Sequence, residues 1–217
     1  MISIVIPTLN SQDSLPRCFD SLIGATVRGL VREVIVADGG SSDGTLAIAD
    51  GAGAHLVHGG KSRGAQFLAG ARTARSDWLL FLHPETALEP AWEGEAESFI
   101  ERSTLERPLV AAFRFAVDEF GSRARRAELS AALRCWLFGL PSGSQGLLIP
   151  RRLYQKLGSH RDVAMEDIDL VRRIGRRRLV MLRSRALNLR RNREDSLRLF
   201  VLHALRLPSG AVSRLAG

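Results

Sequence analysis

Hydrophobic and polar positions follow two patterns over the first ninety residues. Short apolar runs rich in β-branched side chains predict buried strands, and apolar residues three or four positions apart predict amphipathic helices. The predicted strands are residues 2–6, 31–37, 54–57 and 78–82. The predicted helices are residues 14–25, 45–51 and 62–75. Because strands and helices alternate, this region predicts βαβ units and an α/β fold with a mostly parallel central sheet.

The second half of the chain has a less regular pattern. It predicts a strand, a helix that is basic at its start, an apolar run, a short helix and the beginning of another helix, at residues 109–117, 123–138, 147–149, 151–157 and 164–169. Residues 172–193 contain many arginines and no acidic residue, and residues 196–207 are amphipathic. Without a repeat or a linker, residues 1–195 are predicted to form one domain, followed by a tail over residues 196–217.

Composition narrows the class of protein. The chain has 217 residues, 45% hydrophobic and 25% charged, which are ordinary values for one globular domain. Its two cysteines, Cys18 and Cys135, lie far apart and form no CxxC unit, which favours a reducing cytosol. The sequence shows no secretory signal and no apolar run near the roughly 20 residues that span a bilayer. We therefore expect a cytoplasmic protein, either soluble or peripheral on a membrane.

Polar residues and glycines follow each predicted strand of the first half. They are Pro7-Thr8, Asp38-Gly39-Gly40, His58-Gly59-Gly60 and His83-Pro84-Glu85. Ligands of open α/β sheets bind beyond the carboxyl ends of the strands, so these residues are candidates for a binding site. A carboxylate at the end of an apolar strand needs a hydrogen-bond donor. Asp38 could accept a hydrogen bond from a ribose hydroxyl or a base N–H. Asp43 is more simply explained as a turn or cap residue.

Two common nucleotide-binding motifs are absent. The sequence has no GxGxxG fingerprint after its first strand and no GxxxxGK[ST] loop. These absences count against a Rossmann dehydrogenase and against a P-loop enzyme.

Six short motifs, in order, resemble family 2 glycosyltransferases of a bacterial subgroup. They are IVIPTLN at residues 4–10, VIVADGGSSDGT at 34–45, KSRGAQ with AGA at 61–71, LLFLHPET at 79–86, GSQG at 143–146 and MED at 165–167. They span residues 2 to about 174, and their common order makes the resemblance specific. The resemblance implies a GT-A fold, with residues 1–90 as the nucleotide-binding half and residues 91–195 as the acceptor half.

The resemblance also implies a reaction. Such enzymes move a sugar from a nucleotide-diphosphate donor to an acceptor hydroxyl, usually with inversion, which requires a base on the acceptor side. Asp167 is the candidate base, with Glu166 orienting it or the acceptor hydroxyl. The alternative is that Glu166 and Asp167 are only acidic residues at a helix N-terminus, where the helix dipole favours them.

On the donor side, the resemblance places Pro7, Thr8 and Gly39 at the base pocket, with Asp38 at the uracil or ribose of a UDP-sugar. Arg63 is expected at the diphosphate or the base, although it could be a solvated helix residue.

The metal motif departs from the family pattern. A carboxylate pair there usually holds Mg²⁺ or Mn²⁺, whereas this chain has His83-Pro84-Glu85. We expect Glu85 to ligate the metal, with His83 nearby; a zinc site built on His58, His83 and Glu85 has no supporting ligand spacing.

On the acceptor side, Gln145 and Gly146 are expected to meet the donor sugar or the acceptor. Ser144 stands where the subgroup has Asp, so the identity of the subgroup's donor sugar cannot be carried over to this chain. A lipid-linked or polysaccharide precursor is the expected type of acceptor.

The net charge of +8 is carried mostly by arginine. Residues 172–193 could form a solvated basic face or dock on an anionic membrane surface. The tail could lie in that interface, pack on the domain or join a homodimer. Aromatic residues make up only 6% of the chain and no stacking platform is visible, which counts against nucleic-acid binding.

Two rival functions stay open. A nucleotidyltransferase could use a similar sheet, but residues 7–16 lack its usual glycine-rich basic loop. A catalytically impaired module that still binds nucleotide is the other, because the metal motif and Ser144 both depart from the family pattern.

Overall fold

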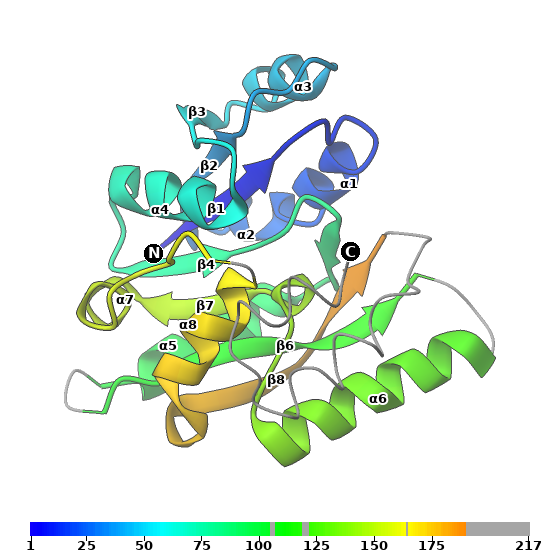
Figure 1. The fold of residues 1–217 in the computed structure, drawn as a ribbon, viewed down its shortest axis with the longest axis vertical. Helices are drawn as coiled ribbons and strands as arrows, with labels where there is room; N and C mark the ends of the chain where they lie inside the picture. The colour runs from blue at the N-terminus through cyan, green and yellow to red at the C-terminus, as the bar shows by residue number, and fades with distance from the viewer. Residues whose placement is uncertain (105–106, 119–121, 164, 190–217) are drawn as a thin grey trace.

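The strands form a mixed sheet whose order is β3-β2-β1-β4-β7-β6-β8-β5 (Figure 1). The structure is a computed structural model that describes residues 1–104, 107–118, 122–163 and 165–189. Its strands are β1 (Ile2–Thr8), β2 (Val31–Asp38), β3 (His55–His58), β4 (Trp78–Phe81), β5 (Thr86–Leu88), β6 (Val110–Val117), β7 (Leu147–Pro150) and β8 (Leu179–Asn188). Its α-helices are α1 (Leu15–Asp20), α2 (Ile23–Val27), α3 (Thr45–Gly51), α4 (Arg63–Thr73), α5 (Trp92–Arg102), α6 (Ser122–Phe138), α7 (Arg151–Lys156) and α8 (Glu166–Ile174), and its short 3₁₀ turns are η1 (Gly143–Gln145) and η2 (Arg176–Arg178).

Most strands of the sheet run in one direction. Parallel pairing joins β1 to β2 and β4, β2 to β3, and β6 to β8. The strand β7 is antiparallel to both β4 and β6, and β5 is antiparallel to β8. The carboxyl ends of β1, β2, β3, β4, β6 and β8 therefore meet at one edge of the sheet, where β7 begins.

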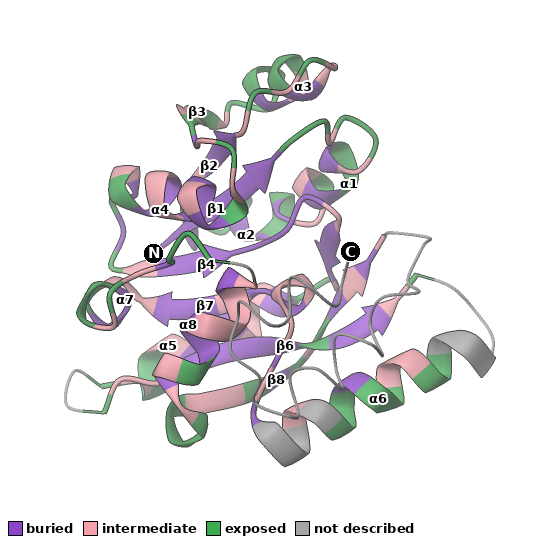
Figure 2. Cartoon of the chain, in the orientation of Figure 1, coloured by how far each residue is buried: buried purple, intermediate pink, exposed green. Residues whose placement is uncertain are grey.

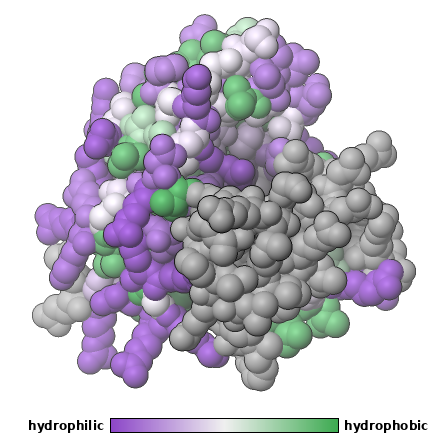
Figure 3. All heavy atoms as spheres, viewed as in Figure 1, coloured by the Kyte–Doolittle hydropathy of each residue, from purple (hydrophilic) through white to green (hydrophobic). Residues whose placement is uncertain are grey.

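Both faces of the sheet are covered by helices. Along β1, Ile2, Ile4 and Ile6 face a core cluster with α1, α2 and α5, whereas Val5 faces a second cluster with α4, α7 and α8. This alternation is the two-residue period of a strand, and both of its faces are buried (Figure 2). In Figure 3 the described surface is mainly hydrophilic, with small separate hydrophobic patches.

The structure departs from the sequence-based elements in a few places. The prediction of one continuous helix over residues 14–25 is wrong, because the structure has two helices there, α1 and α2. Ser21 lies at the break, and its hydroxyl donates to the Cys18 carbonyl at 2.6 Å, which competes with continued helical bonding. The pattern also failed to predict β5, α5 and β8. The amphipathic tail lies outside the described residues, and the division into two halves stays a prediction.

The arginines of β8 made this strand difficult to predict from the sequence. Arg183 and Arg185 are exposed and lie next to the buried Leu182 and Ala186, so the strand has a two-residue period. In the sequence this period is masked by arginines that continue from α8 through η2. None of the described helices is of a length and apolarity that would let it cross a bilayer.

Candidate functional site at the carboxyl edge of the sheet

Asp38 ends β2 at the carboxyl edge and is 6% exposed. One carboxylate oxygen accepts from the hydroxyls of Thr8 at 2.8 Å and Ser41 at 2.5 Å, and the other accepts from the backbone N–H groups of Gly40 and Ser41, each at 2.8 Å. Burial would raise the pKa of Asp38, but these donors, the Ser41 hydroxyl first, outweigh it and lower the pKa. The loop therefore satisfies the carboxylate that ends the strand.

The loop after β2 is joined to the loop after β1 by reciprocal hydrogen bonds. The Asn10 N–H donates to the Ser41 hydroxyl at 2.8 Å, and the Ser42 N–H donates to the Asn10 side chain at 2.9 Å. The carboxylate of Asp43 accepts from the backbone N–H groups of Thr45 and Gln12 at 3.0 and 3.2 Å. This agrees with the turn interpretation of Asp43 and fixes the two loops as one surface next to Pro7 and Thr8.

The start of α4 packs closely against the loops of β2 and β3. A Cβ atom on Gly39 would lie 2.3 Å from the Gln66 amide nitrogen, and one on Gly59 would lie 2.6 Å from Gln66 Cγ. The side chain of Gln66 is buried and donates to the Gly60 carbonyl at 3.2 Å. The glycines of these loops are therefore required for the close approach of α4.

Arg63, the first residue of α4, connects two parts of the edge. Its Nε lies 3.3 Å from a carboxylate oxygen of Glu166, at the start of α8, and its NH1 lies 3.4 Å from Nδ1 of His83, which follows β4. The side chain is 53% exposed. The structure thus brings together Arg63, His83, Glu166 and the neighbouring Asp167, which the sequence predicted from three separate motifs.

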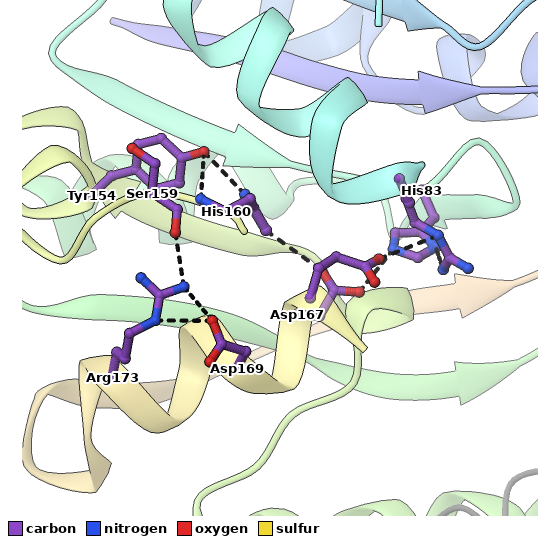
Figure 4. Close-up of polar contacts among 9 residues, drawn as sticks. His83, Tyr154, Ser159, His160, Asp167, Asp169 and Arg173 are labelled. Atoms are coloured by element: carbon purple, nitrogen blue, oxygen red, sulfur yellow. Dashed lines mark hydrogen bonds and ion pairs between the residues drawn. The ribbon is translucent and has the colours of Figure 1, made fainter. Parts of the chain in front are cut away.

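Asp167 lies between two histidines (Figure 4). One carboxylate oxygen is 3.3 Å from Nε2 of His83, and the other is 3.6 Å from Nε2 of His160. Burial would raise the pKa of Asp167, but the adjoining imidazoles of His160 and then His83 outweigh it and hold the pKa well below its usual range. The side chain is 19% exposed, so the ionised carboxylate can still be reached from solvent.

The pKa of the neighbouring Glu166 is shifted in the opposite direction. Burial and then the charge of Asp167 raise the pKa of Glu166, and the positive charge of Arg63 only partly opposes them. Adjacent carboxyl groups whose pKa values are driven apart are typical of acid and base pairs in active sites.

His160 is the functional candidate that the sequence analysis missed. The side chain is fully buried, its ring stacks on Phe67 with centroids 4.6 Å apart, and Nδ1 lies 3.1 Å from the Tyr154 hydroxyl. That hydroxyl accepts the His160 backbone N–H at 3.0 Å, so it can donate its own hydrogen to Nδ1 and leave the ring proton on Nε2, towards Asp167. Nε2 has no hydrogen-bond partner among the described residues. A lone histidine in a loop gave no periodic signal.

The loop that carries His160 is held by the arginine-rich segment. The guanidinium of Arg173 donates to the Ser159 carbonyl at 2.8 Å and to the Asp169 carboxylate at 2.6 Å (Figure 4). Part of the segment predicted as one basic face is therefore internal structure. Arg176, Arg177 and Arg178 lie in η2, and the last arginines of the segment fall outside the described residues.

The loop before β7 closes the site from the other side. A Cβ atom on Gly143 would lie 1.9 Å from a carboxylate oxygen of Asp167 and 2.5 Å from Nε2 of His83, so only glycine fits there. Gln145 is 1% exposed and donates to the Phe113 carbonyl at 2.9 Å, while its side-chain oxygen accepts from the Ser142 N–H at 2.9 Å. Gly146 has a φ of 65° and completes the turn. The contacts of Gln145 hold this loop, and its role towards a sugar stays a prediction.

The turn that carries Glu85 fits a metal ion whose ligands come partly from the protein and partly from the substrate. Among the described residues, no three His, Cys, Asp or Glu side chains are arranged to hold an ion by themselves. Mg²⁺ is commonly bound by one or two carboxylates together with substrate phosphates, and this arrangement needs only one hard oxygen donor from the turn after β4. Glu85 is half-buried in that turn, where the Thr86 N–H donates to the His83 carbonyl at 3.0 Å.

Comparison with known proteins identifies the family and the fold. The model for glycosyl transferase family 2 matches residues 3–136. A glycosyltransferase of PGL/p-HBAD biosynthesis from Mycobacterium bovis is 37% identical over 120 residues, which cover 52% of this chain and 41% of that protein. The chain thus spans about two fifths of the length of the curated relatives it matches.

Two solved structures share the architecture. One is glucosyl-3-phosphoglycerate synthase from Mycobacterium tuberculosis with Mg²⁺ and UDP, which has a TM-score of 0.66 and 21% identity over 96% of this chain and 80% of that one. The other is mannosyl-3-phosphoglycerate synthase from Rubrobacter xylanophilus, with a TM-score of 0.68 and 18% identity over 99% and 73%. The predicted GT-A fold is confirmed.

Proposed function

This chain belongs to glycosyl transferase family 2, and from that premise we propose that it transfers a sugar from a UDP-sugar donor to an acceptor hydroxyl. The observation that carries the proposal is the carboxylate of Asp167 at the carboxyl edge of the sheet. It lies between His83 and His160, and Arg63 lies beside His83. The choice of UDP is supported by the solved glucosyl-3-phosphoglycerate synthase, which was crystallised with UDP and a divalent cation.

The donor is proposed to lie along the ends of β1 and β2. Pro7, Thr8, Asp38 and Gly39 form the base and ribose side, on loops fixed by their mutual hydrogen bonds. The four donors around Asp38 fill the roughly four lone-pair sites of a carboxylate, so a ribose or base donor would replace one of them. Arg63 would meet the diphosphate, because a half-exposed guanidinium at the start of α4 combines its charge with that of a helix N-terminus.

In the proposed reaction, Asp167 accepts the proton of the acceptor hydroxyl while the oxygen forms a bond to the anomeric carbon. The bond from that carbon to the diphosphate breaks, and the nucleoside diphosphate leaves with the bonding electrons. Attack from the side opposite the leaving group inverts the anomeric centre. The lowered pKa of Asp167 keeps the base ionised at neutral pH, and Glu166 orients it or the acceptor hydroxyl.

Charge that develops on the leaving diphosphate needs stabilisation. Arg63 supplies it from this chain. A bound Mg²⁺ or Mn²⁺ would supply further positive charge at the phosphate oxygens, and Glu85 is the residue proposed to hold it.

The proposal extends to the acceptor side with less detail. Gln145 and Gly146 are proposed to face the sugar or the acceptor, and the acceptor is proposed to be a lipid-linked or polysaccharide precursor. Peripheral association with an anionic membrane through residues 172–193, a homodimer and a cytoplasmic location stay predictions.

An impaired nucleotide-binding module is the second candidate. It is favoured by Pro84 and Glu85, which alter the metal motif of the resembling subgroup, and by Ser144, which stands where that subgroup has Asp. It differs from the enzyme in one measurable respect, because it binds nucleotide without turning over a sugar donor.

The test combines binding with turnover. Thermal shifts are measured with UDP, GDP, CDP and ADP, each with Mn²⁺ and with EDTA, and ligand at a hundredfold excess over its Kd should stabilise the protein by about 2.7 kcal/mol. UDP-sugar hydrolysis is then compared for wild type, Asp167→Asn and, as a matched control, the exposed Asp162→Asn. We expect a UDP shift that depends on metal, and hydrolysis that only Asp167→Asn removes. UDP binding with no hydrolysis in any protein supports the module, and the absence of any nucleotide shift contradicts both.

A further inference from the structure

A cavity of about 640 Å³ lies between α6 and the neighbouring strands β6 and β8. The residues of α6 that line it include Arg125, Glu128, Leu129 and Ala132, which share one face of the helix. That face is open rather than packed, because Arg125, Leu129 and Ala132 are all exposed. A volume of this size suits a small-molecule ligand, for which pockets of about 300–1,000 Å³ are usual.

The charge of the cavity is strongly unbalanced. Among the described residues that line it, four are arginines, Arg114 from β6, Arg125 from α6, and Arg183 and Arg185 from β8, and one is a carboxylate, Glu128. A side-chain oxygen of Glu128 already accepts the Val117 backbone N–H at 3.1 Å. Within the part of the chain that the structure describes, none of these four guanidinium groups forms an ion pair with a carboxylate.

Two of the arginines are direct neighbours. Arg114 and Arg185 are partners in the parallel pairing of β6 and β8, so their side chains leave the same face of the sheet, on strands roughly 4.8 Å apart. Like charges in such positions repel each other unless an anion lies between or above them. The arrangement is therefore built for an anionic group, and guanidinium pairs bind phosphate or carboxylate through two hydrogen bonds each.

Apart from Gln145, the other described lining residues are mainly apolar. Phe115, Leu129, Met181 and Leu182 contribute to the walls, and Leu129 is 71% exposed. Leu182 and Phe115 are already buried, so a free inorganic anion would leave the exposed side chains of Leu129 and Met181 in water. A ligand with an anionic group and an apolar portion would contact both parts of the lining.

The cavity lies at the same edge of the sheet as Asp167. The strand β7 begins at Leu147, which pairs with Ala112 of β6. The paired residues from Arg114 and Arg185 onwards therefore extend past the start of β7 at that edge. The loop before β7 connects the two places, because Gln145 lines the cavity and Gly143, two residues earlier, contacts Asp167.

We propose that this cavity is the acceptor site, and that the acceptor is an amphiphilic anion whose phosphate or carboxylate lies on Arg114 and Arg185. The inference rests on the proposed transferase function, since only a transferase needs an acceptor. Its own content is the chemical class of that acceptor.

The experiment measures binding of octyl phosphate, below its micellar concentration, by isothermal titration calorimetry. Inorganic phosphate and octyl glucoside test the anionic and the apolar part separately. The variant is Arg114→Gln/Arg185→Gln, and the control is Arg32→Gln/Arg102→Gln, which removes the same charge from two exposed positions outside the cavity. The UDP thermal shift is recorded for every protein, so that loss of the fold or of the donor site is seen directly.

We expect octyl phosphate to bind wild type at least tenfold more tightly than either partial probe, and at least tenfold more weakly to the cavity variant alone, with the UDP shift unchanged in all proteins. Failure of octyl phosphate to bind wild type, or an equal loss in the control variant, overturns the inference while UDP binding still supports the proposed function. Tighter binding of inorganic phosphate than of octyl phosphate overturns the amphiphilic class. Cavity-specific binding of octyl phosphate without any UDP shift overturns the proposed function, and with it the acceptor role.

Discussion

Replacing His160 with Phe tests how the carboxylate of Asp167 is held. The phenyl ring keeps the stack on Phe67, 4.6 Å between centroids, and removes the Nε2 atom that lies 3.6 Å from Asp167. Asp167 then keeps the contact with His83, at 3.3 Å, and loses one of the two imidazoles that lower its pKa. The pKa of Asp167 should rise towards its usual range, and only one of its two carboxylate oxygens should stay held.

The expected size of the effect follows from these contacts. A misplaced catalytic group can cost on the order of a hundredfold in rate, and because His83 still holds one oxygen we expect a fall in kcat of about ten- to a hundredfold. The Tyr154 hydroxyl loses its partner on the ring, which should cost about 1 kcal/mol of stability. The KM for the donor should not change, because no donor contact is assigned to His160.

The assay is steady-state transfer or donor hydrolysis over pH 4–9, well below the melting temperature. A stability-matched control is Ile2→Val, a buried position at the opposite end of β1, whose substitution should also cost about 1 kcal/mol. We expect kcat to fall only in His160→Phe, with the KM for the donor unchanged in both variants. An equal fall of kcat in both variants, or a raised KM for the donor in His160→Phe, would refute the positioning role of His160.

Three further predictions concern the same edge of the sheet. Gly143→Ala should abolish turnover, because its Cβ would lie 1.9 Å from Asp167, whereas Gly94→Ala, whose Cβ meets nothing within 4 Å, should leave turnover intact. Arg63→Gln should weaken UDP binding by about 1.5–3 kcal/mol, roughly ten- to a hundredfold in the Kd from calorimetry, and Arg102→Gln should not. Finally, the lowered pKa of Asp38 gives stability that is present above the unfolded pKa of about 3.9 and is lost as pH falls through the folded value. Melting temperatures between pH 7 and pH 3 should therefore fall less steeply in Ser41→Ala than in wild type; parallel curves would contradict the assignment.

The sequence by itself determined the secondary structure of residues 1–90 with good detail. The strands β1 and β4 and the second half of β2 are buried on both faces, so they show mainly apolar runs in the sequence. Their ends are marked by Thr8, Asp38 and His83. Local chemistry was equally readable. Glycine and serine after Asp38 indicated a tight loop, and this loop provides the donors that satisfy the carboxylate.

Other elements required the tertiary structure. The strand β8 owes its place to pairing with β6, which lies about seventy residues earlier in the chain, and its exposed arginines concealed the alternation. Pairing across that distance also placed Arg114 opposite Arg185. A local pattern records which faces of an element are apolar, but it contains no information about which distant strand lies beside it.

The carboxyl edge of the sheet shows the same limit at the level of single side chains. Motifs identified Asp167 and Arg63 separately, but only the packing of α4 against α8 sets the contact of Arg63 with Glu166. His160 became a candidate because the fold buries its ring between Phe67 and Phe81 and directs Nε2 to Asp167. Apolar periodicity and strand ends are properties of neighbouring residues, whereas the partners of a buried imidazole are set by long-range packing.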